Sequence, residues 1–367
     1  MFTDAVILAG GFGERLWPAS KPEYPKQFLS LEEGISFLQS SILRAAALNL
    51  KGKILIITRI DLLEPTVVQC STLAQQLESN LQKKIKEDLI VIAEPEPKHT
   101  AAPAILACQF LDKMFPNTEH FLLVLTSDHA ISPIESFTRD CRTAFEYAHK
   151  DNFVCFAIKP TEPATGFGYI KSGTTLGKGE AFQIAEFKEK PDFETARKYI
   201  ESETYWWNSG MFAFGSSFFK EELKKCEPDI YTAFEEIPFA SLPAIKHLKG
   251  IKYVKDWDAM KKAYDASPAI SMDKAVAERT RRACAVKATF SWDDVGSWDA
   301  FGKMFSAPPE KTAFVKSSNC FVYSDIPVAI CGVDDLIVVI KNGNALVAKK
   351  GSSTLVREAA QKMNSLE

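Results

Sequence analysis

Short apolar runs alternate with longer amphipathic segments through the first 160 residues of the chain. Apolar runs of this length, separated by segments of helical period, are typical of βαβ units whose parallel sheet is covered on both faces. Residues in the seventies and eighties add a further helical stretch. The pattern predicts strands over 5–10, 53–58, 89–95, 121–129 and 153–160, and helices over 34–50, 100–115 and 136–149.

The spacing of apolar positions changes after residue 160. The segments GYIKSG, FQIAEFKEKP and WWNSGMFAFG are strand-like and predict an antiparallel layer, and helices are expected from about 216 to 280. Short β-runs follow a break at 307–312, and Asn342-Gly343 is a strong hairpin signal. We therefore expect an α/β fold with a mixed, mainly parallel sheet in a working domain of residues 1–305, followed by a small β-rich C-terminal domain of residues 306–367.

Composition restricts the partners of the chain. The 44 basic and 47 acidic residues give a net charge of −3, which provides no long-range attraction to nucleic acid or to a membrane. The eight cysteines are scattered without CxxC pairs, as in a protein of a reducing compartment. No apolar run reaches the roughly 20 residues of a membrane span, and the start has no signal-like basic region. We expect a soluble cytoplasmic protein, and any anion site must be local.

The stretch LAGGFGERLWPASKPEYPKQF (8–28) places a glycine-rich turn directly after the first predicted strand. Glycines allow main-chain N–H groups to approach a ligand, and Arg15 and Lys26 indicate that this ligand is an anion. Leu16 stands where GxGxxG needs its third glycine, and GxxxxGK[ST] does not occur, so neither dinucleotide nor Walker A binding is indicated. The alternative is a glycine-rich turn with incidental surface bases.

Two acidic positions are candidates for a metal site. Asp128 follows a buried strand, and ligands of open α/β sheets bind at the carboxyl ends of strands. One or two carboxylates with phosphate oxygens are the usual protein site for Mg²⁺. WDDVGSW offers Asp293 and Asp294, of which one could share the ion. The alternatives are a helix-capping Asp128 and a solvated acidic turn.

Two further segments suit a sugar. FKEKPD contains Glu189 and Lys190, and WNSGMF places Asn208 and Ser209 between aromatic residues. Polar groups beside aromatic rings can bind both the hydroxyls and the C–H faces of a sugar. Each segment alone is also compatible with an ordinary β-turn.

Together these motifs resemble the sugar-nucleotidyltransferase family, and within it the mannose-1-phosphate guanylyltransferase branch. The resemblance implies a Rossmann-like nucleotidyltransferase core. It also implies that GTP and α-D-mannose 1-phosphate are joined into GDP-mannose and diphosphate by an in-line transfer assisted by Mg²⁺. The matching motifs occur in the family's order over nearly all of residues 5–300: LAGGFGERLWPASKPEYPKQF, EPEPKHTAAPAI, LTSDHAI, GFGYIKSG, FKEKPD, WNSGMF, ISMDKAVAE and WDDVGSW.

The resemblance also implies roles for individual residues. Arg15 and Lys26 would be catalytic and bind phosphate, and Asp128 and Asp294 would be catalytic and hold the metal ion. The sugar phosphate would be bound by Gly168, Tyr169, Glu189, Lys190 and Asn208. The nucleotide would be bound by Leu8, Ala9, Gly10, Gly11, Gly13, Glu14, Arg15, Lys26, His99, Thr100, Ser127 and Asp128.

Some positions depart from the family pattern. KHTAAPAI stands where RNTAPAI is usual, so His99 replaces an Asn and Pro103 is displaced by one position. TSDH replaces the common PSDH, and Asp293 occupies a position that is usually serine. The cupin domain of longer, bifunctional relatives does not occur in this sequence, and we expect no phosphomannose isomerase activity.

Two alternative functions stay open. One keeps the reaction but uses another nucleoside triphosphate or another hexose or heptose 1-phosphate. The other is a non-catalytic homologue that senses GDP-mannose, which would be expected to lack the loop arginine or a metal aspartate, whereas Arg15 and Asp128 are both present. A homodimer is considered as well.

Overall fold

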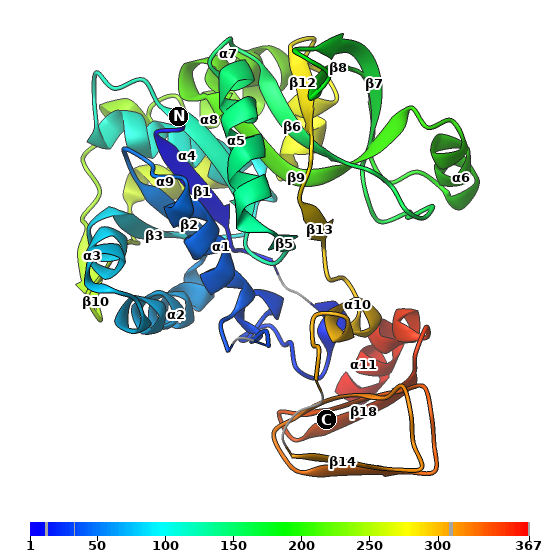
Figure 1. Cartoon of the computed structure of the whole chain (residues 1–367). Coiled ribbons are helices and arrows are strands. Elements are labelled where there is room, and N and C mark those ends of the chain that lie inside the picture. Colours follow the sequence, from blue (N-terminus) through cyan, green and yellow to red (C-terminus); the bar gives the residue numbers. More distant parts are fainter. Residues whose placement is uncertain (12–13, 33, 308–310, 366–367) are drawn as a thin grey trace. The chain divides into compact units, whose positions relative to one another are not determined.

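A computed structural model describes residues 1–11, 14–32, 34–307 and 311–365 of the chain (Figure 1). The chain divides into two compact units. Unit 1 comprises residues 1–10, 41–127 and 131–292, and unit 2 comprises residues 11–40, 128–130 and 293–367.

Unit 1 is built on an eleven-stranded mixed sheet with the strand order β10-β11-β3-β2-β1-β4-β9-β6-β12-β8-β7. Pairing is parallel among β11, β3, β2, β1 and β4, whereas β9 runs antiparallel to both β4 and β6. The parallel first half and the antiparallel later layer confirm the fold class that the sequence predicts. The strands are β1 (Asp4–Leu8), β2 (Ile54–Arg59), β3 (Leu89–Glu94), β4 (Phe121–Thr126), β6 (Phe153–Ile158), β7 (Tyr169–Leu176), β8 (Ala181–Lys188), β9 (Tyr205–Gly215), β10 (Lys246–Leu248), β11 (Ile251–Val254) and β12 (Ala283–Lys287).

Helices cover both faces of this sheet. Val6 and Leu55 belong to one core cluster with residues of α4, α7, α8 and α9, whereas their strand neighbours Ala5 and Ile56 are equally buried outside that cluster. Helix α5 packs against β6, β9 and β12 (Figure 1). The α-helices that lie wholly in unit 1 are α2 (Leu63–Gln76), α3 (Ser79–Asp88), α4 (Ala101–Met114), α5 (Ile134–Ala148), α6 (Phe193–Glu201), α7 (Ser216–Cys226), α8 (Pro228–Phe234) and α9 (Asp258–Ala266).

Several short elements complete the description of the chain. Helix α1 (Phe37–Ala47) and the strands β5 (Ala130–Ser132) and β13 (Ser291–Asp293) include residues from both units. Unit 1 also contains the 3₁₀ helices η3 (Ile60–Leu62) and η4 (Ile237–Phe239) and the π-helix η5 (Asp273–Ala277).

The predicted strands and helices of the first 160 residues are confirmed to within a few residues at each end. The later region contains a pair of strands, β10 and β11, within a stretch that the sequence pattern assigns to helices. These strands are short and rich in lysine, and their turn is formed by Lys249 and Gly250 in left-handed conformations, with φ of 50° and 81°. Strand β11 pairs in parallel with β3 and has only two buried side chains, which is too few for a periodic signal.

Unit 2 contains two small sheets, one of β14 with β16 and one in the order β15-β17-β18. The hairpin at Asn342-Gly343 is confirmed, because both residues have positive φ (54° and 77°) and Lys341 pairs with Asn344 across the turn. The elements are η1 (Glu14–Leu16), η2 (Lys26–Phe28), α10 (Trp298–Gly302), β14 (Thr312–Val315), β15 (Phe321–Ser324), β16 (Val328–Cys331), β17 (Leu336–Lys341), β18 (Asn344–Lys349), η6 (Ser353–Leu355) and α11 (Val356–Asn364).

The core of unit 2 joins segments that are distant in sequence. Leu16, Ala19 and Phe37 pack in one cluster with Trp298 and with apolar residues of β15, β17, β18 and α11. The β-rich C-terminal region therefore shares its core with the segment 11–40. The division that the sequence pattern suggests, after residue 305, runs through the middle of unit 2.

Candidate functional site

The glycine-rich turn begins at the carboxyl end of β1. Leu8 ends the strand, Ala9 is fully buried, and Gly10 lies so close to β3 that a Cβ atom at this position would be 2.7 Å from Oε1 of Glu94. A side chain at this position would displace the carboxylate of Glu94. Gly11 is exposed, as a residue open to a ligand would be.

Gly13 and Glu14 are also predicted to bind the nucleotide. Gly13 lies outside the described residues. Glu14 opens η1, but its side chain lies outside the described part of the chain.

Glu94 is a buried acid that the sequence reasoning missed. Its Oε2 accepts a hydrogen bond of 2.9 Å from the hydroxyl of Tyr264. Burial raises the pKa of Glu94 to about 7, although the Tyr264 hydrogen bond and the charge of Arg59 oppose this shift. In the sequence, Glu94 lies near the end of the third predicted strand, 89–95. Its closeness to the glycine-rich turn is visible only in the structure.

Lys26 lies at the centre of a charged cluster in unit 2. Its side chain is only 7 % exposed, and its Nζ is 3.1 Å from Oδ2 of Asp128 and also donates a hydrogen bond to the backbone carbonyl of Asp294. The ammonium lies 5.3 Å from the centre of the Phe37 ring, within the range of a cation–π contact. The structure thus brings together three of the four residues predicted to be catalytic.

Arg15 is the fourth member of this cluster. Its Nη1 lies 3.6 Å from Oδ2 of Asp294, and its side chain is 66 % exposed. Asp294 is held by its own turn, because its Oδ1 accepts a hydrogen bond of 3.1 Å from the N–H of Gly296. The neighbouring Val295 is buried and has a left-handed φ of 46°. The turn therefore holds one carboxylate and leaves the guanidinium accessible to an anion.

Gly296 is a second residue that the sequence reasoning missed. A Cβ atom at this position would lie 2.7 Å from Nη1 of Arg15 and 2.9 Å from Oδ2 of Asp294. Any side chain here would displace the guanidinium or the carboxylate. The glycine of WDDVGSW was visible in the sequence, but its contact with a residue 281 positions away was not.

The charge of the cluster favours an ionised Asp128. Burial raises the pKa of this carboxyl, but the ammonium of Lys26 opposes the shift most strongly, followed by the His129 imidazole. The hydrogen bond from Lys26 and the guanidinium of Arg15 act in the same direction, so that the pKa of Asp128 lies below its usual value. His129 Nε2 is 3.7 Å from Oδ1 of Asp128. Asp128 is therefore a carboxylate at neutral pH.

The donors of this cluster suit a hard cation that takes most of its ligands from elsewhere. Asp128 and Asp294 provide carboxylate oxygens. Lys26 is bonded to the carboxylate of Asp128 and to the main-chain carbonyl of Asp294. Within the described ranges, no group of three or more His, Cys, Asp or Glu side chains could hold a metal ion. Two carboxylates with no third protein ligand fit Mg²⁺ bound chiefly by phosphate oxygens and water.

The residues predicted for the sugar phosphate lie together in unit 1. Nζ of Lys190 is 3.0 Å from Oε1 of Glu189, and the N–H of Asn208 donates a hydrogen bond of 2.8 Å to the carbonyl of Gly168. A Cβ atom on Gly168 would lie 2.7 Å from Oε2 of Glu189, so this glycine permits the approach of the carboxylate. The Lys190 side chain is 63 % exposed and that of Glu189 is 20 % exposed.

Asp273 belongs to this group and was missed. Nδ2 of Asn208 donates a hydrogen bond of 2.7 Å to Oδ1 of Asp273. Burial, together with the nearby Glu189 carboxylate, raises the pKa of Asp273 to about 6. The motif ISMDKAVAE contains this residue, but no sequence pattern links it to Asn208, which is 65 positions away.

Tyr169, Thr100 and Ser127, which are also predicted to bind a substrate, lie in unit 1. The Tyr169 hydroxyl donates a hydrogen bond of 3.0 Å to the carbonyl of Ala164, and its ring is fully buried. Oγ1 of Thr100 accepts a hydrogen bond of 2.8 Å from the N–H of Met272. Ser127 is buried at the end of β4. The side-chain hydrogen bonds of Tyr169 and Thr100 therefore hold the backbone at Ala164 and Met272.

His99, by contrast, is exposed and adopts a left-handed backbone conformation with φ of 57°. This conformation is uncommon for a residue other than glycine, and it lies directly before the cap of α4. The family pattern has Asn at this position, and Asn adopts this conformation more readily than most residues.

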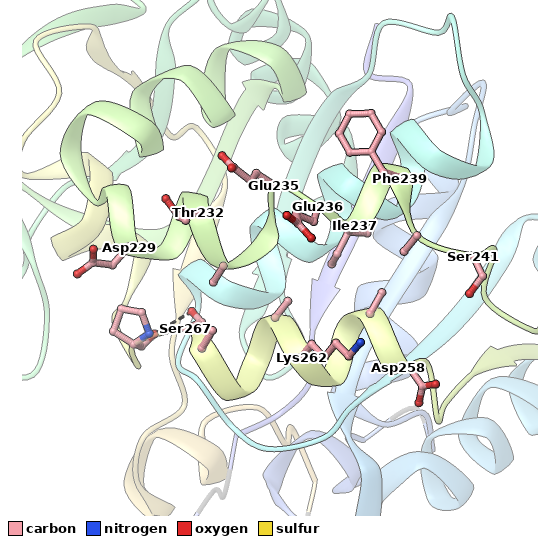
Figure 2. A pocket seen from close by; sticks show the side chains of 16 residues that line it. Asp229, Thr232, Glu235, Glu236, Ile237, Phe239, Ser241, Asp258, Lys262 and Ser267 are labelled. Carbon is pink, nitrogen blue, oxygen red and sulfur yellow. Dashed lines mark hydrogen bonds between the residues drawn. The ribbon is translucent and has the colours of Figure 1, made fainter.

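A cavity of about 1030 Å³ lies in unit 1 between the segment of α8 and η4 and the helix α9 (Figure 2). Figure 2 shows Glu235 and Glu236 on one side of it and Lys262 on the other. None of the residues predicted for nucleotide, sugar or metal lines this cavity. Its size therefore does not identify the functional site.

Among the described helices, none combines the length and the apolar character that crossing a bilayer requires.

Comparison with known proteins identifies the family of the chain. The nucleotidyl transferase family model matches residues 4–310. A mannose-1-phosphate guanylyltransferase of Escherichia coli is 33 % identical over 371 residues, covering 98 % of this chain and 75 % of the relative. One of Salmonella muenchen is 36 % identical over 355 residues, covering 95 % of this chain and 70 % of the relative.

A solved structure agrees with these relatives. The crystal structure of a protein described as mannose-1-phosphate geranyltransferase from Thermus thermophilus has a TM-score of 0.79 and 29 % sequence identity, covering 99 % of this chain and all of that one. The chain is therefore an enzyme of the nucleotidyl transferase family and belongs to its mannose-1-phosphate guanylyltransferases.

Proposed function

We propose that this enzyme transfers the guanylyl group of GTP to α-D-mannose 1-phosphate and gives GDP-mannose and diphosphate. A phosphate oxygen of the sugar phosphate forms a new bond to the α-phosphorus of GTP, and the bond from that phosphorus to the diphosphate breaks in line. The observation that carries the proposal is the charged cluster of Lys26, Arg15, Asp128 and Asp294 in unit 2.

The attacking group needs no general base. A phosphate monoester has a second pKa near 6 and is largely ionised at neutral pH. The obstacle is electrostatic, because two unit charges 4 Å apart repel by about 4 kcal/mol at an effective dielectric constant of 20. A site for this reaction must therefore provide fixed positive charge, and the described residues provide it at Arg15 and Lys26.

The two cations would have different tasks. Lys26 is buried and fixed by two oxygen partners, so it would act as a preorganised charge that stabilises the transferring phosphate without reorganisation. Arg15 is exposed, and its planar guanidinium could bind phosphate oxygens in a bidentate manner and follow the leaving diphosphate.

Nucleotidyl transferases generally use a divalent metal ion, and we propose Mg²⁺ held by Asp128 and Asp294. Once bound, Mg²⁺ would neutralise phosphate charge during the transfer. Asp128 supports this role because its pKa is held low, so the carboxylate is ready to bind a cation throughout the neutral range.

The polar group of unit 1 would bind the sugar phosphate. Glu189 and Asn208 offer a carboxylate and an amide for sugar hydroxyls, and the exposed ammonium of Lys190 would pair with the phosphate. Asp273 would act on the sugar indirectly, by holding the amide of Asn208 in one orientation.

A panel of substrates tests the proposal. Diphosphate release is measured with GTP, ATP, UTP and CTP against mannose, glucose and heptose 1-phosphates, and the highest kcat/KM is expected for GTP with mannose 1-phosphate. A preference for another nucleotide would overturn the guanine assignment, and His99 would then be the first residue to exchange, as His99→Asn. Absence of turnover with every pair would favour a non-catalytic sensor.

Assembly and location are proposed on separate grounds. We propose a cytoplasmic enzyme because all eight cysteines are free and five of them are buried, as in proteins of reducing compartments. We also propose a homodimer, because two-fold dimers are the commonest soluble oligomers. Light scattering coupled to size-exclusion chromatography would distinguish a mass of about twice 40.8 kDa from that of the single chain.

A further inference from the structure

A second cavity, of about 450 Å³, lies within unit 2 and is lined by none of the residues assigned above to nucleotide, sugar or metal. Its walls are the segment 17–23, the turn of the β17–β18 hairpin, and helix α11. This volume lies within the usual range of small-molecule sites. The lining residues are Trp17, Pro18, Ser20, Lys21, Pro22, Glu23, Asn342, Asn344, Arg357, Ala360, Gln361 and Met363.

The lining has the chemistry of a site for a hydroxylated anion. Two of the lining residues, Lys21 and Arg357, are basic, and one, Glu23, is acidic. The amide of Gln361 and the amide oxygens of Asn342 and Asn344 can pair with hydroxyl groups. Trp17 offers an indole ring on which the C–H face of a sugar can pack.

Ser20 provides an independent sign of a missing partner. It is only 2 % exposed, and its hydroxyl oxygen has no hydrogen-bond partner among the described residues. Buried polar atoms are nearly always hydrogen-bonded, and an unsatisfied one is costly. This oxygen is enclosed by protein atoms, so a ligand oxygen would reach it and supply the missing hydrogen bond only if the segment 17–23 shifted.

The cavity adjoins the backbone that carries the catalytic cations. The segment 17–23 is the connection between Arg15 and Lys26. It is fastened from the C-terminal side, since Nδ2 of Asn342 donates a hydrogen bond of 2.9 Å to the carbonyl of Pro18 and Nε1 of Trp298 donates one of 2.8 Å to the carbonyl of Trp17. A ligand in contact with this segment would restrict its movement.

We propose that this cavity is a regulatory site for a small sugar phosphate, distinct from the catalytic residues. Binding of the ligand at Lys21 and Arg357 fixes the segment 17–23 and thereby changes how Arg15 and Lys26 bind the nucleoside triphosphate. The binding of the ligand stands independently of the proposed function, whereas its effect on turnover rests on that function.

The test measures binding and turnover separately. Glucose 6-phosphate, inorganic phosphate and glucose are each titrated without nucleotide, by calorimetry and by tryptophan fluorescence, using the whole chain and its Trp17→Phe variant. Saturable binding of glucose 6-phosphate is expected, at least tenfold tighter than binding of inorganic phosphate or glucose, with a fluorescence change that Trp17→Phe removes.

Four variants separate the cavity from the catalytic residues. Arg357→Ala and Lys21→Ala are expected to weaken binding of glucose 6-phosphate at least fivefold. Lys362→Ala, on the same helix but outside the cavity lining, is the matched control and is expected to leave binding unchanged. Arg15→Ala is expected to keep the binding signal, because Arg15 does not line the cavity.

Turnover gives the second readout. In the wild-type enzyme, glucose 6-phosphate is expected to change the KM for the triphosphate at least twofold, and Arg357→Ala is expected to abolish this change without altering basal turnover. Loss of binding in Arg15→Ala, unchanged binding in Arg357→Ala, or equal affinity for inorganic phosphate would each overturn the proposal. If a nucleotide other than GTP proves to be the substrate, the binding results are unaffected, so failure of the two proposals can be told apart.

Discussion

Lys26 joins two carboxylate-bearing residues through one buried ammonium. Its oxygen partners are the side chain of Asp128 and the main chain of Asp294, so removing the charge would affect both predicted metal ligands at once. A buried charge with fixed partners is costly to leave unpaired, and for that reason Lys26 is expected to contribute to stability as well as to catalysis.

We predict that Lys26→Met lowers kcat by a factor of about 10²–10³, as loss of one preorganised charge-stabilising donor does in other enzymes. The side chain keeps its length and its contact with Phe37, so a loss of turnover would report the charge. Lys53→Met is the matched control, because Lys53 also pairs with an aspartate, Asp88, and lies 5.8 Å from the ring centre of Phe115. Its kcat should stay within twofold of wild type, and equal losses in both variants would contradict the assignment.

We predict that Lys26→Met also changes how the free energy of unfolding depends on pH. The pKa of Asp128 is lowered in the folded state, so its stabilising contribution is present above the usual aspartate value near 4 and is lost as the pH falls through the folded value. Lys26→Met removes the largest of the influences that lower this pKa. The free energy of unfolding, measured from pH 3 to pH 7, should therefore rise less steeply with pH in the variant than in wild type.

For Asp273 we predict the opposite dependence of stability on pH. Its folded pKa of about 6 lies above the usual value, so the folded state holds the proton more tightly than the unfolded chain does. Stability is then lost as the pH rises from about 4 to about 6. Asp273→Asn keeps an oxygen for Nδ2 of Asn208 but cannot ionise, and thermal unfolding across this range should lack that loss.

The kinetics of position 273 distinguish a positioning role from a purely structural one. Asp273→Ala should raise the KM for the sugar phosphate about tenfold with little change in the KM for the nucleotide, and Asp273→Asn should restore most of the affinity. An equal rise in both KM values, or no rescue by Asn, would mean that Asp273 does not orient Asn208.

At the scale of elements, the sequence predicts what local periodicity encodes. The strands β1 to β4 and β6 are continuous apolar runs because both faces of the sheet are covered, and the hairpin at Asn342 is encoded by two residues that tolerate positive φ. Strands β10 and β11 were missed because β11 depends on pairing with β3. Such pairing between distant segments leaves no local pattern.

The residues of the candidate site likewise fall into those that the sequence reveals and those that only the structure reveals. Arg15, Lys26 and Asp128 were recognisable because each follows a strand or a glycine turn in a motif. Asp273 and Gly296 lie close to Asn208 and Arg15, respectively, at sequence separations that periodicity cannot detect. Motif resemblance pointed to the neighbourhood of both residues, but only the folded geometry assigns them a partner.

Helix α10 connects the C-terminal strands with the loop that carries the cations. Its first residue, Trp298, is fully buried and donates its indole N–H to the carbonyl of Trp17. We predict that Trp298→Phe lowers stability by about 1–3 kcal/mol, because the half-buried carbonyl of Trp17 is left without its donor. It should also raise the KM for the triphosphate, because the segment next to Arg15 is released. Urea unfolding and steady-state kinetics measure the two effects.

Trp257→Phe is the control for this prediction. Trp257 is also buried and donates its indole N–H to a backbone carbonyl, that of Ser241 in unit 1, at 3.1 Å. A similar loss of stability is expected, but with an unchanged KM. If both variants raised the KM equally, the effect would be one of general destabilisation.

At the scale of the whole molecule, the core of unit 2 joins the C-terminal strands to the segment that carries the proposed catalytic residues Arg15 and Lys26. Leu16, Ala19 and Phe37 bury their side chains against residues of β15, β17, β18 and α11. A chain truncated after residue 305 would expose this apolar cluster and release the segment that carries Arg15 and Lys26.

We predict that the fragment 1–305 retains the helical circular dichroism of unit 1 but loses at least 99 % of its turnover and tends to aggregate. Supplying residues 306–367 as a separate polypeptide should restore part of the activity if the strands refold on the loop. Full activity of the fragment alone would show that the two segments fold independently, as the division after residue 305 implies.

The tip of the β17–β18 hairpin is exposed, yet its Asn342 holds the main chain at Pro18. An antibody fragment that bound this tip and broke the hydrogen bond from Asn342 to the carbonyl of Pro18 would act as an inhibitor without covering any proposed substrate-binding group. Inhibitors of this kind need not resemble a nucleotide, so they could spare the many other enzymes that use one.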